Sequence, residues 1–79
     1  MRLDKFLKVS RVIKRRPVAN EACDSGRVMI NGKVAKASTE VKIGDIVEIK
    51  YGEKIIKFEI ASINEIATKH GAEGMIKPL

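Results

Sequence analysis

The run of residues 14–32 constrains the fold of this chain more than any other stretch. Pro17 follows three consecutive cations and suits the beginning of a helix, because the N–H that proline lacks is not needed there. Gly26 suits the left-handed position that commonly ends a helix. Asn31 and Gly32 then form the dipeptide that most strongly signals a two-residue hairpin turn. The run therefore predicts a cationic loop, a short helix, a strand and a tight hairpin in direct succession.

The spacing of apolar residues predicts two short helices in the first part of the chain. Leu3, Phe6 and Leu7 recur at helical spacing, which indicates an amphipathic helix over roughly residues 3–10. Asp4 lies in its first turn, where a carboxylate meets the positive end of the helix dipole. The second helix, over residues 17–25, is too short to be stable alone. It must therefore bury an apolar face, which we expect to consist of Val18, Ala19, Ala22 and Cys23.

Beyond the second helix the apolar period changes to two, which is typical of strands. Turn residues at 44–45 and 51–53 separate the later segments. The expected strands cover residues 27–30, 33–36, 46–49 and 55–60, and in the last of them Ile56, Phe58 and Ile60 share one face. This order predicts a small α+β domain, in which two short N-terminal helices pack on an antiparallel sheet of about four strands.

The end of the chain carries fewer structural signals. We expect the domain to span residues 1–64 and residues 65–79 to form a tail of uncertain structure. One helical turn over residues 68–75 is the most that the tail suggests, because two glycines oppose a longer helix. We expect His70, the only histidine, to be a solvated tail residue rather than a general base. With no catalytic constellation, nucleotide-binding loop or Cys/His metal spacing, the sequence indicates a protein that is not an enzyme and needs no cofactor or metal.

Composition favours one small globular domain. The 79 residues are 44% hydrophobic, which is enough for one modest core. The single cysteine excludes an internal disulfide framework and fits a reducing cytoplasm, and we expect it to be a small buried hydrophobe rather than a reactive thiol. No apolar run approaches the length of a membrane span. We therefore expect a cytoplasmic protein with no membrane partner.

Positive charge gathers in the first half of the chain. Residues 1–36 hold ten Lys and Arg against three acids, a net charge of +7, whereas residues 37–79 have a net charge of −1. Such an imbalance indicates a polyanionic partner, with nucleic acid favoured over an anionic membrane surface. Aromatic residues are only 4% of the chain, so contacts to phosphate are favoured over base stacking. The candidate RNA-binding residues are Arg2, Lys5, Lys8, Arg11, Lys14, Arg15, Arg16, Arg27, Lys33 and Lys36.

Arg16 is the candidate with the sharpest physical argument. It precedes Pro17 at the beginning of the second helix, where backbone N–H groups and the helix dipole favour an anion. A phosphate held there would also receive the planar fork of the guanidinium. Arg2 is its expected companion. The structural alternative is that Arg16 pairs with Glu21.

A pattern of residues spread over residues 2–49 resembles the S4 domain, an RNA-binding module. The pattern begins with the run RLDKFL at residues 2–7 and continues with Arg11, Arg16, Ala19, Gly26, Val28, Ile30, Asn31, Gly32, Val34, Lys36, Ser38, Gly44, Asp45 and Val47. Among stand-alone members, it is most similar to the heat-shock protein fifteen family and its short bacterial relatives, the RqcP branch. The compact length of this chain favours that branch.

The resemblance implies a role on the ribosome. Members of these families bind the large ribosomal subunit after it has dissociated with nascent-chain tRNA still attached, and the RqcP branch supports the untemplated C-terminal tailing of stalled chains. The resemblance thus implies rRNA of the large subunit as partner, with tRNA and other quality-control factors on the same particle. It also implies that Arg2, Arg11, Lys14, Arg15 and Arg16 face RNA. We expect the protein to act as a monomer.

Two alternatives remain from the sequence alone. The chain could be a constitutive ribosome-assembly factor or structural rRNA-binding protein, which would be present on every subunit. It could also be an adaptor whose basic face meets an acidic protein.

Overall fold

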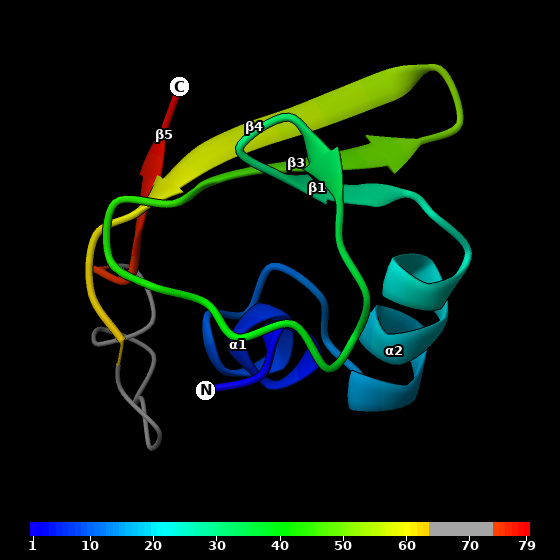
Figure 1. Cartoon of the computed structure of the whole chain (residues 1–79), viewed down its shortest axis with the longest axis horizontal. Coiled ribbons are helices and arrows are strands. Elements are labelled where there is room, and N and C mark those ends of the chain that lie inside the picture. Colours follow the sequence, from blue (N-terminus) through cyan, green and yellow to red (C-terminus); the bar gives the residue numbers. More distant parts are fainter. Residues whose placement is uncertain (64–73) are drawn as a thin grey trace.

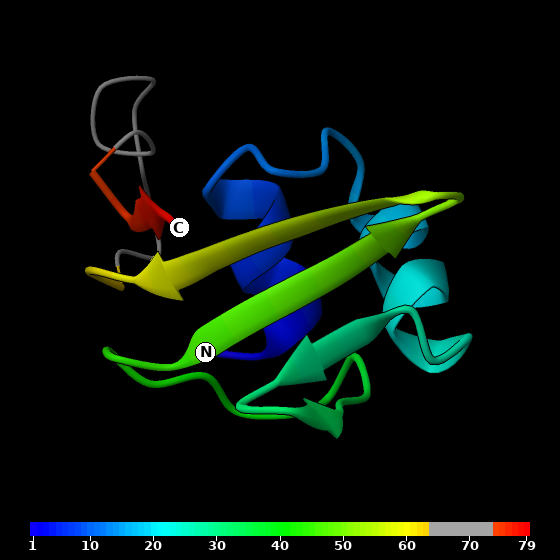
Figure 2. The same cartoon turned by 90° about the horizontal axis from the view of Figure 1, so that it is seen from above.

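The structure is a computed structural model, and it describes residues 1–63 and 74–79. Two helices form one layer and an antiparallel sheet forms the other (Figures 1 and 2). The α+β class predicted from the sequence is confirmed. The elements are α1 (Leu3–Val9), α2 (Arg16–Asp24), β1 (Val28–Ile30), β2 (Lys33–Val34), β3 (Ile46–Tyr51), β4 (Lys54–Ile60) and β5 (Ile76–Pro78).

The sheet has the strand order β2-β1-β3-β4-β5, with every neighbouring pair antiparallel. Strands β1 to β4 are the four that the sequence predicts. Strand β5 is a fifth, in the tail to which the sequence assigned no definite structure, and it pairs Ile76 with Ile60. Its three residues are too few to show an alternating pattern, and Pro78 is tolerated because the strand lies at an edge.

Part of the C-terminal prediction cannot be compared with the structure. His70 and most of the predicted helical turn over 68–75 lie outside the described residues, and the expected boundary at residue 64 stays a prediction. Residues 74–75 form a turn before β5. Met75 in this turn is fully buried, so the end of the chain contributes to the core.

The Asn31-Gly32 turn has the backbone conformation that its sequence requires. Asn31 has φ 52° and Gly32 has φ 83°, and the flanking residues Ile30 and Lys33 pair across the strands. Two consecutive positive φ values define the hairpin turn whose twist matches that of the strands. The Asn31 side chain also accepts a hydrogen bond from the Ile46 N–H at 3.0 Å, which ties the hairpin to the beginning of β3.

The core lies between the two layers and joins α1 to the sheet. Phe6 of α1 and Phe58 of β4 stack with their ring centroids 6.5 Å apart. Leu3 and Leu7, on the same helix face as Phe6, are also fully buried. Each such side chain contributes roughly 1.5–3 kcal/mol to stability. This packing fixes the position of α1, and with it the side chains that α1 presents to solvent.

One predicted core position is wrong. Val18 is 48% exposed, because α2 turns Ala19, Ala22 and Cys23 toward the core instead. Ile56 shares a strand face with the buried Phe58 and Ile60 but is 42% exposed, because it lies near the tip of the β3–β4 hairpin, which rises away from the helices (Figure 1). Among the described residues no helix is long and apolar enough to cross a membrane.

Candidate nucleic-acid interface

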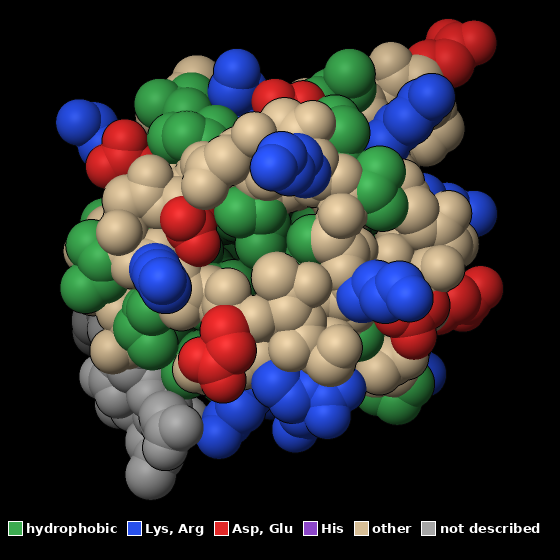
Figure 3. Space-filling view, viewed as in Figure 1, with side chains coloured by type: hydrophobic (Ala, Val, Ile, Leu, Met, Phe, Trp, Pro, Cys, Tyr) green, Lys and Arg blue, Asp and Glu red, His purple; other side chains and the backbone are tan. Residues whose placement is uncertain are grey.

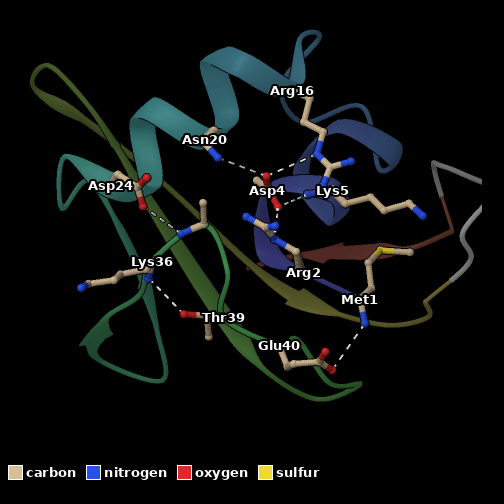
Figure 4. Close-up of polar contacts among 11 residues, drawn as sticks. Met1, Arg2, Asp4, Lys5, Arg16, Asn20, Asp24, Lys36, Thr39 and Glu40 are labelled. Carbon is tan, nitrogen blue, oxygen red and sulfur yellow. Dashed lines mark hydrogen bonds and ion pairs between the residues drawn. The ribbon is translucent and has the colours of Figure 1, made fainter.

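The carboxylate of Asp4 organises the polar surface between α1 and α2. Its side chain is only 3% exposed. Its Oδ2 accepts hydrogen bonds from Arg16 Nε at 3.3 Å and from Asn20 Nδ2 at 3.4 Å. Its Oδ1 accepts the Lys5 N–H at 2.9 Å and lies 3.4 Å from Arg2 Nε. Figure 4 shows Arg2 and Arg16 converging on Asp4 from the beginnings of the two helices.

The surroundings of Asp4 keep it charged. Burial raises the pKa of this carboxyl, but the hydrogen bonds from Asn20, Arg16 and the Lys5 backbone outweigh burial and hold the pKa below its usual value. A charged Asp4 attracts both guanidinium groups, which would otherwise repel each other. The side chains of Arg2 and Arg16 remain 49% and 47% exposed. Since each uses Nε toward Asp4, their terminal nitrogens are left to donate to an external phosphate.

A second pair of contacts brings Lys36 to the same surface. Asp24, at the end of α2, accepts a hydrogen bond from the Ala37 N–H at 3.2 Å. The Lys36 N–H donates to Thr39 Oγ1 at 3.0 Å, which closes the loop after β2 (Figure 4). The loop is thus held against α2, where Lys36 and Arg2 line a shared hollow.

The converging side chains line two neighbouring hollows in the surface. One, of about 350 Å³, is lined by Arg2, Asp24, Lys36, Ala37 and Ser38. The other, of about 530 Å³, is lined by Arg2, Asp4, Arg16, Pro17 and Asn20. They share Arg2, so three cations from distant parts of the sequence surround one concave surface. The beginning of α2 borders this concave surface, and no side chain caps that end of the helix. We call the residues lining the two hollows the Asp4 surface.

The structure separates the ten predicted RNA-binding residues into groups. Arg2, Arg16 and Lys36 line the Asp4 surface. Neither hollow is lined by Arg27, which follows α2, or Lys33, which lies in β2. The remaining five lie on α1 or on the connection between α1 and α2. Lys5 is half-buried, and the other four are exposed: Lys8, Arg11, Lys14 and Arg15. In Figure 3, Lys and Arg side chains gather at the lower edge of the molecule, below the helices.

Sequence reasoning missed the residues that hold this surface together. Asp4 was interpreted only through the helix dipole, and Asn20 and Asp24 were assigned no role. The predicted alternative for Arg16, a pair with Glu21, is replaced by the pair with Asp4. A signal was present, because Asp4 lies three residues before the buried Leu7 in the helix and therefore borders its apolar face.

Arg11 has an unusual backbone conformation for an arginine. Its φ is 63°, in the left-handed region, and its N–H donates to the Lys8 carbonyl at 3.1 Å as α1 ends. Glycine is the usual residue at such a position. A side chain there costs roughly 1 kcal/mol or more relative to glycine. The guanidinium of Arg11 projects from an exposed residue next to the cationic connection.

Cys23 is buried, as the sequence predicts, with 1% exposure. Burial, reinforced by the negative charges of Asp4 and Asp24, raises the pKa of its thiol to about 11. The thiol is therefore protonated at neutral pH and is not a nucleophile.

The chain is similar to known proteins in sequence and in fold. The model of the S4 domain family matches residues 1–47. The RQC P-site tRNA stabilizing factor of Halalkalibacterium halodurans is 54% identical over 72 residues, covering 91% of this chain and 82% of that protein. The factor of the same name from Streptococcus pneumoniae is 49% identical over 75 residues, covering 95% and 85%. The trimeric structure of Vibrio cholerae heat shock protein 15 has a TM-score of 0.90 and 29% identity, covering 100% of this chain and 81% of that one.

The role of Asp4 can be tested through the pH dependence of stability. The pKa of Asp4 is lower in the folded protein than in the unfolded chain, where it is about 3.9. The ionised carboxylate therefore stabilises the folded state fully above the pKa of the unfolded chain. This stabilisation is lost as the pH falls through the pKa of the folded state. We expect Asp4→Asn to lower the melting temperature at pH 7 and to remove this part of the acid dependence. Thermal melts of both proteins between pH 2 and pH 7 (roughly the range of the titration) provide the measurement. Parallel stability curves would contradict the assignment.

The Arg11→Gly variant distinguishes the effect of Arg11 on the stability of the protein from its effect on RNA binding. Glycine relieves the left-handed strain but makes the unfolded chain more flexible, so we expect an unchanged or higher melting temperature. Loss of a charge-assisted contact should weaken RNA association about tenfold. The control Arg11→Ala keeps the strain and should lose binding to the same degree. If Arg11→Gly binds RNA like the wild type, Arg11 is not a contact.

Proposed function

Because this chain belongs to the S4 domain family, in the branch of the RQC P-site tRNA stabilizing factors, we propose that it binds RNA on stalled ribosomal particles. Its partner is rRNA of the dissociated large subunit, with tRNA that carries the nascent chain as a second contact. Bound there, it supports C-terminal tailing of the stalled chain during ribosome quality control. It acts in the cytoplasm, by binding rather than by catalysis.

The observation that carries this proposal is the convergence of Arg2, Arg16 and Lys36 around the Asp4 surface. Arg2 immediately precedes α1, Arg16 begins α2 and Lys36 lies in the loop after β2, all within the part of the chain that matches the S4 model. Arginine forks and lysine charges suit phosphate oxygens. Structured RNA is recognised largely through its backbone and shape.

Aromatic stacking has no part in this mode of binding. Phe6 and Phe58 are buried in the core. Tyr51, the only tyrosine, lies at the end of β3, whereas the Asp4 surface borders the helices. The protein should therefore recognise the arrangement of phosphates on a particle rather than a base sequence. We propose that one copy is sufficient, although the solved Vibrio relative is described as a trimer.

Arg16→Ala tests the proposal against a matched control. Lys57 is comparable to Arg16, because its side chain is 50% exposed and it pairs with an acid, Glu48, at 3.7 Å. We expect Arg16→Ala to remove most association with large subunits carrying peptidyl-tRNA, and Lys57→Ala to leave it unchanged. The measurement is co-sedimentation of each purified variant with such subunits through a sucrose cushion.

The contact with Asp4 means that Arg16→Ala also loses some stability, about 0–1 kcal/mol for a half-exposed pair. Arg16→Lys controls for this, because lysine keeps the charge but lacks the planar fork. It should melt near the wild-type temperature and still bind more weakly. Wild-type co-sedimentation of Arg16→Ala, or an equal loss with Lys57→Ala, would place the RNA on another face.

A further inference from the structure

The hollow between the end of α2 and the loop after β2 holds a carboxylate beside its cations. Its lining consists of Arg2, Asp24, Lys36, Ala37 and Ser38. Asp24 Oδ1 accepts the hydrogen bond from the Ala37 N–H at 3.2 Å (Figure 4). Within the part of the chain that the structure describes, Asp24 Oδ2 has no hydrogen-bond or ion-pair partner, although Arg2 and Lys36 line the same hollow. Because Asp24 is an exposed residue, this oxygen is open to a bound molecule.

The charge of Asp24 is unfavourable if the hollow binds phosphate alone. Asp4, the other carboxylate of this surface, is 3% exposed, and neighbouring groups of the protein contact both of its oxygens. The free oxygen of Asp24 instead repels any phosphate that Arg2 and Lys36 attract. An asparagine at position 24 would hold the Ala37 N–H equally well without this repulsion. The carboxylate therefore indicates a ligand that brings a hydrogen-bond donor together with its phosphates.

The RNA backbone carries such a donor beside each phosphate, the ribose 2′-hydroxyl. In dinucleotide-binding proteins an Asp or Glu accepts a hydrogen bond from this same hydroxyl. Amino groups of bases are also donors, but none of the described residues that line the hollow is aromatic, so no base is held there by stacking. We propose that Asp24 accepts a hydrogen bond from a ribose 2′-hydroxyl whose flanking phosphates contact Arg2 and Lys36. This proposal rests on the RNA binding proposed above, and it makes Asp24 the residue that distinguishes RNA from a backbone without the hydroxyl.

Paired hairpin probes test this proposal. One is a short fluorescent RNA hairpin, and the other has the same sequence with a 2′-fluoro group in place of every ribose hydroxyl. Fluorine keeps the duplex in the A-form but cannot donate a hydrogen bond. Fluorescence anisotropy at low salt, where phosphate contacts are strongest, gives the affinity of the protein for each hairpin. We expect the wild type to bind the RNA hairpin about tenfold more tightly, because fluorine removes a hydrogen bond to a charged acceptor.

The Asp24→Asn variant distinguishes recognition of the hydroxyl from support of the loop. The amide oxygen still accepts the Ala37 N–H, whereas a nitrogen donor replaces the free carboxylate oxygen. We expect a melting temperature near that of the wild type and the loss of most of the preference for RNA. The affinity for the 2′-fluoro hairpin should be unchanged or higher, because a negative charge leaves the hollow. The matched control is Glu21→Gln, which removes the same charge from an exposed residue of α2 outside both hollows and should keep the preference.

The proposal is overturned if the wild type binds both hairpins equally or binds neither, or if Asp24→Asn keeps the wild-type preference. It is also overturned if Asp24→Asn weakens the binding of both hairpins to the same degree, since Asp24 would then only hold the loop, or if Glu21→Gln loses the preference as well. Arg16→Ala should weaken the binding of both hairpins alike and leave the ratio of their affinities unchanged. Co-sedimentation of Arg16→Ala with large subunits tests the proposed function without reference to this ratio, so the two proposals fail separately.

Discussion

The ion pairs of the buried Asp4 carboxylate are the interaction on which the rest of this structure depends. A charge removed from water is unfavourable unless partners surround it. Asp4 meets this requirement with Arg2, which immediately precedes α1, and with Arg16 and Asn20 on α2. The contacts join the first turn of α1 to the first turns of α2. The polar network therefore complements the core formed by Phe6 and the sheet.

The same interaction prepares the surface for an anion. Two guanidinium groups side by side repel each other, and free arginine side chains lose considerable entropy when a ligand orders them. Asp4 compensates the repulsion and holds one nitrogen of each side chain, so part of that ordering precedes binding. The remaining nitrogens face solvent at nearly half exposure. A phosphate placed there would complete the network rather than disrupt it.

The prediction from sequence succeeded where structure follows from local pattern. The spacing of Leu3, Phe6 and Leu7 gave α1, and the Asn31-Gly32 turn gave the first hairpin, because both depend on neighbouring residues alone. The spaced pattern over residues 2–49 also indicated the correct family. These features need no knowledge of which segments meet in three dimensions.

The features that the sequence did not reveal depend on long-range packing. Strand β5 forms only because Ile76 finds Ile60 in β4. Val18 is exposed because the sheet selects which side of α2 is buried. The partnership of Asp4 with Arg16 joins residues twelve positions apart on different helices, so no local spacing indicates it. Of the ten predicted RNA-binding residues, packing brings only Arg2, Arg16 and Lys36 to the Asp4 surface.

Cryo-electron microscopy of particles purified through this protein tests the central claim most directly. The account predicts a large ribosomal subunit in which the Asp4 surface contacts the RNA backbone, with phosphates within hydrogen-bonding distance of the Arg2 and Arg16 guanidinium groups. A structure in which this surface faces solvent, and in which RNA contacts the outer face of the sheet instead, would contradict it.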